Sequence, residues 1–323
     1  MPDPVTDVLG PPYTAETIGL APDAEGEVVA TLVHRPAVGP ARGAVLHVHG
    51  FADYFFQDAF ATWLSERGWD VYALDLRKYG RSLRPHQTPT DVDDLRTYGE
   101  ELDAAWSRVT ERDGHDHVVV SAHSTGAPVV ALWAHDRSEA LRGVLAGMVL
   151  NSPWLDLAGP WWLRTVGTRA IDLVGGVRPA VVVPRTIDGG YGRSLHVEFG
   201  GSHDYDLAWK PIDSFPVRFG WLRAVRRAHA ELHRGIDLPC PVLVLTSDRS
   251  TVPPLSDDDL ATSDVVLDVE QMWRWAPRLG RRVEVVAVEG AVHDVVLSRE
   301  PALGRVYAEL DRWLAAFAET PAP

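Results

Sequence analysis

One serine of the sequence lies in a pattern that favours nucleophilic chemistry. Ser124 is the centre of the pentapeptide AHSTG at residues 122–126, which follows the apolar run 118–122 and precedes an apolar helical pattern at 129–133. Small residues two places before and two places after such a serine let a strand and a helix approach closely across a sharp turn. Ala122 stands where this pattern usually has glycine, which is a mild departure because alanine is nearly as small. We therefore predict that Ser124 is a nucleophile.

A serine hydroxyl attacks efficiently only when a base takes its proton. Where a serine follows a strand in this way, the acid and the histidine come later in the chain. His233 and His293 are the histidines that lie beyond residue 230. His293 follows an expected strand at 283–288, at the sheet edge where functional groups gather, whereas His233 falls in an expected helix before the strand at 242–246. We expect His293 to be the base.

Two backbone N–H groups are needed to stabilise the negatively charged oxygen of a tetrahedral intermediate. The residue after the nucleophile, Thr125, is expected to supply one of them. The second is expected from the loop after an early strand, where His49-Gly50-Phe51 follows the apolar run 44–48. The Phe51 N–H is therefore the candidate, and its side chain remains available to line an acyl pocket.

The carboxylate that would orient His293 has two candidates. Asp248 lies directly after the apolar run 242–246, which is the usual place for this group. Asp264 lies further along, followed by an apolar stretch at 265–267. Position alone leaves both open.

Short apolar runs bounded by turn residues indicate the strands that position these residues. They lie at 44–48, 69–74, 118–122, 144–150, 242–246 and 283–288. Near-continuous apolar runs are typical of strands covered on both faces, and segments with helical spacing separate several of them. This alternation predicts an α/β fold with a mostly parallel central sheet and helices on both faces. Residues 28–34 are expected to add an antiparallel strand near the start.

Residues 154–235 interrupt the alternation. Tryptophan is frequent in this segment, at positions Trp154, Trp161, Trp162, Trp209 and Trp221. A segment of this length between two core strands, with helical patterns of its own, indicates an inserted cap and not a loop. One amphipathic cap helix is expected around 221–232. The expected division is a core of residues 1–153 and 236–323 and a cap of residues 154–235.

The composition is that of a globular protein and excludes several classes of partner. The formal net charge is −14, whereas nucleic-acid binding needs clustered positive charge. The single cysteine, Cys240, permits no internal disulfide. No apolar segment is long enough to span a membrane, and the N-terminus lacks the features of a signal peptide, so a cytoplasmic location is expected. No dinucleotide-binding motif or metal-ligand spacing is present, and we expect no cofactor and no metal.

Several motifs together resemble the monoacylglycerol lipase and lysophospholipase-like branch of the α/β-hydrolases, which is grouped with the serine aminopeptidases. They are the His49-Gly50 loop, the segment DLRKYGRS at 75–82, the serine pentapeptide at 122–126 and Gly290-Ala291-Val292-His293. The resemblance covers residues 43–152 and 236–317 and is weak in the expected cap. In that family an aspartate followed by a short apolar stretch precedes the histidine at a spacing like that of Asp264. The resemblance therefore implies Asp264 as the acid.

The resemblance also implies the α/β-hydrolase fold and the hydrolysis of a carboxylic ester. In this hypothesis Ser124 attacks the ester, His293 relays the proton, Asp264 orients His293, and water releases the acyl group. The tryptophan-rich cap favours a small-molecule ester with an apolar acyl or alcohol group. An amidase, peptidase or acyltransferase that uses the same residues is an alternative. A non-catalytic small-molecule binder with the same fold is a second alternative.

Overall fold

The computed structural model describes residues 4–157, 168–184 and 189–318. Its centre is a nine-stranded sheet with the strand order β1-β2-β3-β5-β4-β6-β7-β8-β9. The strands are β1 (Val5–Thr6), β2 (Thr14–Asp23), β3 (Gly26–Arg35), β4 (Gly43–Val48), β5 (Trp69–Asp75), β6 (Val118–His123), β7 (Leu145–Asn151), β8 (Val242–Ser247) and β9 (Val283–Val288). Strands β5, β4, β6, β7, β8 and β9 pair in parallel, while β1, β2 and β3 form an antiparallel edge. The predicted mostly parallel sheet is confirmed.

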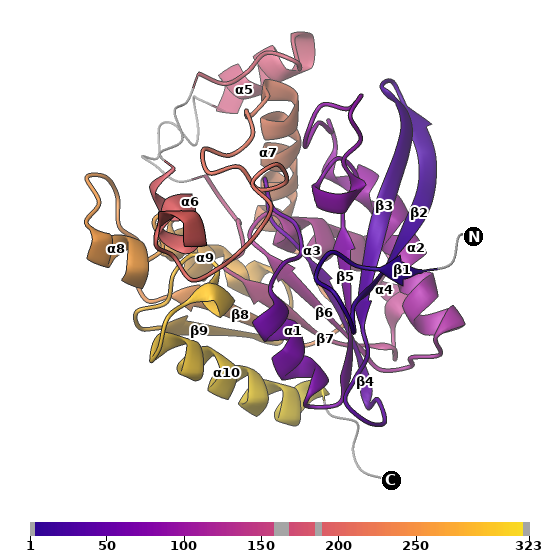
Figure 1. The fold of residues 1–323 in the computed structure, drawn as a ribbon. Helices are drawn as coiled ribbons and strands as arrows, with labels where there is room; N and C mark the ends of the chain where they lie inside the picture. The colour runs from indigo at the N-terminus through magenta and orange to yellow at the C-terminus, as the bar shows by residue number, and fades with distance from the viewer. Residues whose placement is uncertain (1–3, 158–167, 185–188, 319–323) are drawn as a thin grey trace.

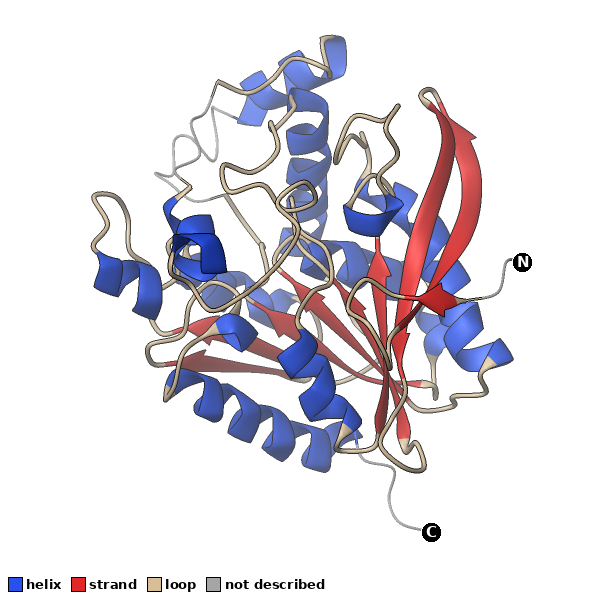
Figure 2. Cartoon of the chain, in the orientation of Figure 1, coloured by secondary structure: helices blue, strands red, loops and turns tan. Residues whose placement is uncertain are grey.

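Helices cover both faces of this sheet (Figures 1 and 2). The α-helices of the described residues are α1 (Asp58–Ser65), α2 (Gly99–Ser107), α3 (Gly126–Asp136), α4 (Ser138–Leu141), α5 (Thr168–Val177), α6 (Gly190–Leu195), α7 (Phe219–Arg234), α8 (Asp257–Thr262), α9 (Val269–Trp275) and α10 (Ala302–Trp313). Within the described ranges, none of them is long and apolar enough to cross a membrane.

The apolar strands supply two cores because successive side chains point to opposite faces of a sheet. Val45 and Val119 pack on the face that α1 and α10 cover, whereas Leu46 and Val120 pack on the face that α2 and α3 cover. Each strand must be apolar on both sides, which explains the continuous runs in the sequence.

The segment between β7 and β8 carries α5, α6 and α7 and lies beyond the carboxyl ends of the parallel strands (Figure 1). The amphipathic helix expected around 221–232 corresponds to α7, which buries Trp221, Val225 and Leu232 and packs against both α3 and α5. Trp161 and Trp162 lie outside the described residues.

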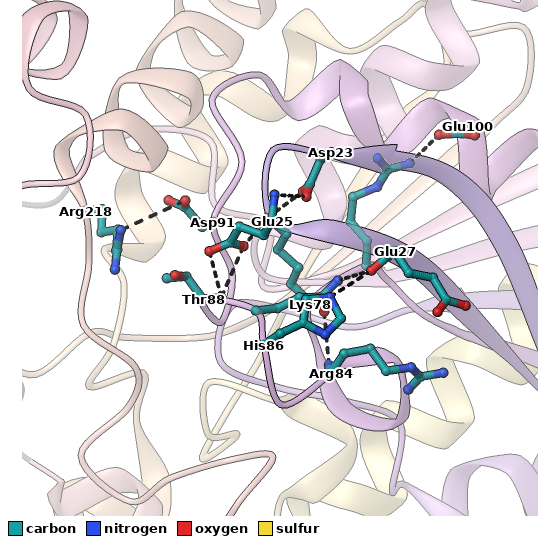
Figure 3. A network of polar contacts seen from close by, with 12 residues as sticks. Asp23, Glu25, Glu27, Lys78, Arg84, His86, Thr88, Asp91, Glu100 and Arg218 are labelled. Carbon is teal, nitrogen blue, oxygen red and sulfur yellow. Dashed lines mark hydrogen bonds and ion pairs between the residues drawn. The ribbon is translucent and has the colours of Figure 1, made fainter.

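The basic loop after β5 is a structural turn. Lys78, whose φ is 62°, reaches between the carboxylates of Asp23 and Glu25 on the β2–β3 hairpin, at 2.6 and 2.7 Å (Figure 3). A further contact in the same network joins Arg218, at the start of α7, to Asp91 at 4.0 Å. These ion pairs join the hairpin to the loop and the loop to α7.

Candidate active site

Ser124 lies on a sharp turn between β6, which ends at His123, and α3, which begins at Gly126. Its φ is 51°, a left-handed value that is uncommon for a residue with a side chain. Two backbone hydrogen bonds hold this conformation: the Ser124 N–H donates to the carbonyl of Asn151 at 2.9 Å, and the Ser124 carbonyl accepts from the Trp154 N–H at 3.1 Å. Strain of this kind is common at functional sites and here directs the hydroxyl out of the turn.

Ser124, His293 and Asp264 form one hydrogen-bonded series. The Nε2 of His293 lies 3.1 Å from the Oγ of Ser124, and the Nδ1 of His293 lies 2.8 Å from the Oδ2 of Asp264. A carboxylate can only accept a hydrogen bond, so Nδ1 donates and Nε2 remains free to accept from the serine hydroxyl. All three residues are buried, with exposed fractions of 8%, 3% and 0% for Ser124, His293 and Asp264. This order of groups and contacts is the one that lets a histidine take a proton from a serine.

The Asp264 carboxylate is held by its own loop. Its second oxygen accepts from the N–H groups of Val266 and Leu267, at 2.9 and 2.8 Å. Its backbone pairs with the segment after β8, where the Asp264 N–H donates to the Arg249 carbonyl and its carbonyl accepts from the Thr251 N–H. These bonds direct the other carboxylate oxygen toward His293.

Asp248, the other candidate, has a different partner. One of its carboxylate oxygens accepts from the N–H of Gly290 at 3.0 Å. Gly290 has a φ of 76° and belongs to the turn that leads from β9 to His293. Asp248 therefore stabilises the turn that carries the histidine, whereas Asp264 contacts the imidazole ring.

The loop that carries Phe51 lies directly against the serine turn. A Cβ atom built on Gly50 would lie 3.1 Å from the Cβ of Ser124, so a side chain at this position would crowd the serine turn, and glycine lets the two backbones approach closely. Among the described residues, neither the Phe51 N–H nor the Thr125 N–H has a hydrogen-bond partner. His49 joins this loop to the end of β5, since its Nε2 accepts a hydrogen bond from the Leu76 N–H at 3.0 Å.

Aromatic side chains flank this loop. The Phe51 ring lies 4.1 Å from the ring of Trp221 on α7, measured between centroids, and Trp154 lies 5.8 Å from Trp221 on its other side. Trp209 contacts Tyr54 at 5.1 Å. Trp221 and Trp209 therefore pack onto the stretch that begins with Phe51, beside Ser124, and Trp154 packs behind Trp221.

Two residues that no sequence motif had indicated reach the site from the segment between β7 and β8. The hydroxyl of Tyr191 on α6 accepts from the Asp294 N–H at 2.9 Å, and its ring meets the His293 ring edge-on at 6.0 Å. The ammonium group of Lys210 pairs with Asp53 at 2.7 Å. Neither Tyr191 nor Lys210 belongs to a recurring sequence motif. The position of Asp294 directly after His293 was the one feature of the sequence that pointed to a further polar contact here.

A group of buried charges surrounds the serine turn. The Nδ1 of His123 lies 3.3 Å from Asp53, and Asp294 accepts from the side-chain amides of Gln57 and Asn151 at 3.0 and 2.6 Å. Burial opposes protonation of His123, but the Asp294 and Asp53 carboxylates outweigh it and raise its pKa. Burial likewise opposes ionisation of Asp294, but His123 and the two amides outweigh it and lower the pKa of this carboxyl.

Across residues 4–157, 168–184 and 189–318, no group of three or more histidine, cysteine, aspartate or glutamate side chains could hold a metal ion.

Known structures with the same fold include several lipases and esterases. A soluble variant of the monoglyceride lipase from Saccharomyces cerevisiae, solved with a substrate analogue, is 16% identical; the alignment covers 94% of this chain and 96% of that one, with a TM-score of 0.69. The monoacylglycerol lipase of Paleococcus ferrophilus is 18% identical, with coverages of 88% and 98% and a TM-score of 0.61. A carboxyl esterase from Bacillus coagulans, in complex with glycerol, is 13% identical, with coverages of 94% and 99% and a TM-score of 0.63. These likenesses confirm the α/β-hydrolase fold.

No curated protein sequence matches the chain. The family described as serine aminopeptidase, S33, matches residues 39–300, which include Ser124, Asp264 and His293. The match spans most of the chain and includes all six parallel strands, β4 to β9. The protein is therefore a hydrolase of the serine aminopeptidase S33 family.

Proposed function

We propose that the protein hydrolyses carboxylic esters through an acyl-enzyme on Ser124. The hydrogen-bonded series from Asp264 through His293 to the Ser124 hydroxyl is the observation that carries this proposal. The Ser124 oxygen attacks the ester carbonyl carbon while His293 Nε2 takes the hydroxyl proton. Asp264 holds the imidazole in the required tautomer and stabilises the imidazolium that forms.

The remaining steps use the same groups. The N–H groups of Phe51 and Thr125 stabilise the oxyanion of the tetrahedral intermediate, a contribution of about 3 kcal/mol for each donor. His293 then returns its proton to the departing alcohol, and the acyl group stays on Ser124. Water attacks this acyl-enzyme with His293 again as the base, which releases the carboxylic acid and restores the serine.

The substrate in this proposal is an ester with an apolar acyl or alcohol group. Phe51 and Trp154 are partly exposed and pack with the buried Trp221 beside the oxyanion donors, so the aromatic surface next to these donors suits apolar groups. The similar structures are named as a monoglyceride lipase, a monoacylglycerol lipase and a carboxyl esterase, and these names support ester hydrolysis. We further propose that residues 154–235 form the cap over a core of residues 1–153 and 236–323.

Peptide or amide hydrolysis remains the second candidate because the family is described as a serine aminopeptidase. An aminopeptidase needs a free carboxylate near the serine to bind the amino group of its substrate. Of the carboxylates beside the described site, Asp53 is paired with Lys210, and Asp294 is bound by Gln57 and Asn151. This arrangement favours the ester.

A fluorophosphonate probe, followed by p-nitrophenyl esters of graded acyl length and by aminoacyl p-nitroanilides, tests the proposal. We expect labelling at Ser124, turnover of esters that rises from acetyl to longer acyl groups, and loss of both in Ser124→Ala. Ser121→Ala, which removes a buried hydroxyl of β6 that is bonded to His47 on the neighbouring strand β4, is the matched control and should keep both. Absence of labelling refutes the nucleophile, labelling without turnover supports a non-catalytic binder, and faster turnover of the anilides supports the peptidase.

A further inference from the structure

A lysine from the segment between β7 and β8 reaches the base of the serine turn. The Lys210 ammonium lies 2.7 Å from Oδ1 of Asp53, which follows the oxyanion loop and is only 1% exposed. The lysine side chain is itself 14% exposed. An ion pair on an open surface contributes little, but one partner of a buried pair cannot be removed without leaving the other uncompensated.

The contact continues from Asp53 to the proposed catalytic histidine. The other carboxylate oxygen of Asp53 lies 3.3 Å from Nδ1 of His123, the residue directly before Ser124. The His123 ring in turn lies 5.0 Å from the His293 ring, measured between centroids. Lys210 is thus joined to the neighbourhood of His293 through two side chains.

Lys210 is held in place by aromatic contacts. Its ammonium lies 5.4 Å from the centre of the Phe56 ring and 5.7 Å from that of Tyr205, within the range of cation–π attraction. The Asp206 N–H donates to the Tyr54 hydroxyl at 2.7 Å. Residues 205–210 therefore dock on the stretch that continues from the oxyanion loop, and the ammonium is positioned before any substrate arrives.

The charges around the two histidines come from several elements. The groups that face His123 or His293 are Asp53, Asp264, Asp294, Lys210, His47, His49 and Tyr191 on α6, whose pKa burial raises well above its usual value, so that its hydroxyl stays neutral. Burial lowers the pKa of both His47 and His49, so these two rings are neutral near pH 7. The charged groups that remain are three carboxylates, the Lys210 ammonium and the His123 imidazole, whose pKa Asp294 and Asp53 raise. Loss of the Lys210 charge leaves an excess of negative charge beside His293, which favours the protonated imidazole.

We propose that Lys210 is a positioning residue that neutralises Asp53, so that a charge from the cap sets the pH range in which His293 accepts the serine proton. The proposal rests on the function proposed above, because it takes His293 as the base. The docked segment 205–210 then influences the charge on the base and does not only pack beside the site.

The pH dependence of kcat/KM for p-nitrophenyl butyrate tests this role, because its acid limb reports protonation of the base. In Lys210→Met the limb should move to higher pH by about one unit, as expected for an unbalanced neighbouring charge. In Asp53→Asn it should move the other way, since the lysine charge is then unopposed. The double variant should return to near the wild-type position, and Lys210→Arg should retain it.

Arg218→Met is the matched control. Arg218 also lies between β7 and β8, and its substitution removes a cation that pairs with Asp91 (Figure 3). It should leave the acid limb in place. A merely structural role of Lys210 would lower kcat/KM at every pH without moving the limb, and that result overturns the proposal. Thermal unfolding of each variant identifies any loss of folded protein.

A second measurement does not depend on turnover. We compare Ser124→Ala with the double variant that also carries Lys210→Met. The NMR signals of the His123 ring nitrogens should titrate at higher pH in the double variant. An unchanged titration contradicts the proposal even if the enzyme proves to act on another substrate. Failure of the fluorophosphonate probe to label wild-type Ser124, in contrast, refutes the proposed function and not the contact between Lys210 and Asp53.

Discussion

Gly126 is the position of the serine turn where the structure leaves least room. A Cβ atom there would lie 2.5 Å from the His49 carbonyl oxygen and 2.8 Å from the Val48 carbonyl oxygen. Both oxygens belong to the backbone of β4 and of the loop that leads to Phe51, so no side-chain rotation can relieve the contact. Gly126→Ala must therefore move α3 away from that loop.

The size of the movement sets the size of the effect. Real Cβ contacts begin near 3.0 Å, so the two backbones must separate by about half an ångström. A misplacement of about 1 Å can cost about 100-fold in rate. We therefore expect kcat/KM to fall about 10- to 100-fold. Overpacking of this kind should also lower the free energy of unfolding by about 1–3 kcal/mol.

Ester hydrolysis, the rate of fluorophosphonate labelling and urea unfolding measure these effects separately. Gly19→Ala is the control, because a Cβ on Gly19 in β2 would meet no atom within 4 Å and its backbone is extended. That variant should match the wild type in rate and be no less stable. If Gly126→Ala keeps kcat/KM within about twofold of the wild type, the close approach of the two backbones does not constrain the serine turn, and our reading of it is wrong.

Two further predictions concern the acid and a buried histidine. Asp264→Asn should lower kcat by about 10³- to 10⁴-fold because the imidazole loses its orientation, whereas Asp248→Asn should cost less than about tenfold; steady-state kinetics decides, and the reverse order would overturn the assignment. Burial lowers the pKa of His47 from 6.5 to about 4, so the folded state favours the neutral ring. The stability that follows is present above pH 6.5 and is lost as the pH falls toward 4. His47 should thus account for a loss of about 2 kcal/mol between pH 7 and pH 5 in urea unfolding, and His47→Leu should lack this component; an equal loss in both proteins contradicts it.

Most of the parallel part of the sheet was predictable from the sequence because β4 to β8 are buried on both faces, while β9 at the edge is only half-buried but is still mostly apolar in sequence. The runs at 44–48 and 118–122 fall within β4 and β6, and 28–34 falls within the antiparallel β3. Strands β1 and β2 were missed. β2 alternates buried and exposed residues along part of its length and ends exposed at the edge, so it contains no continuous apolar run.

The contacts of the segment 154–235 were not predictable residue by residue. Sequence patterning predicted α7 because a helix that packs on one side has a regular apolar face. Tyr191 and Lys210, in contrast, bind Asp294 and Asp53 across the fold, more than 100 residues away in the chain. Such pairs leave no local spacing in the sequence, because only folding makes them neighbours.

The position of Ser124 follows from local chemistry alone. A buried strand, two small residues and a helix within a few positions specify a sharp turn by steric exclusion, and all of these can be recognised in the linear sequence. The partner of His293 cannot be recognised in this way. Asp248 and Asp264 both follow β8, and their loops fold so that Gly290 binds the first while the His293 ring meets the second. Hydrogen bonds between distant loops make that choice, and they exist only in the folded chain.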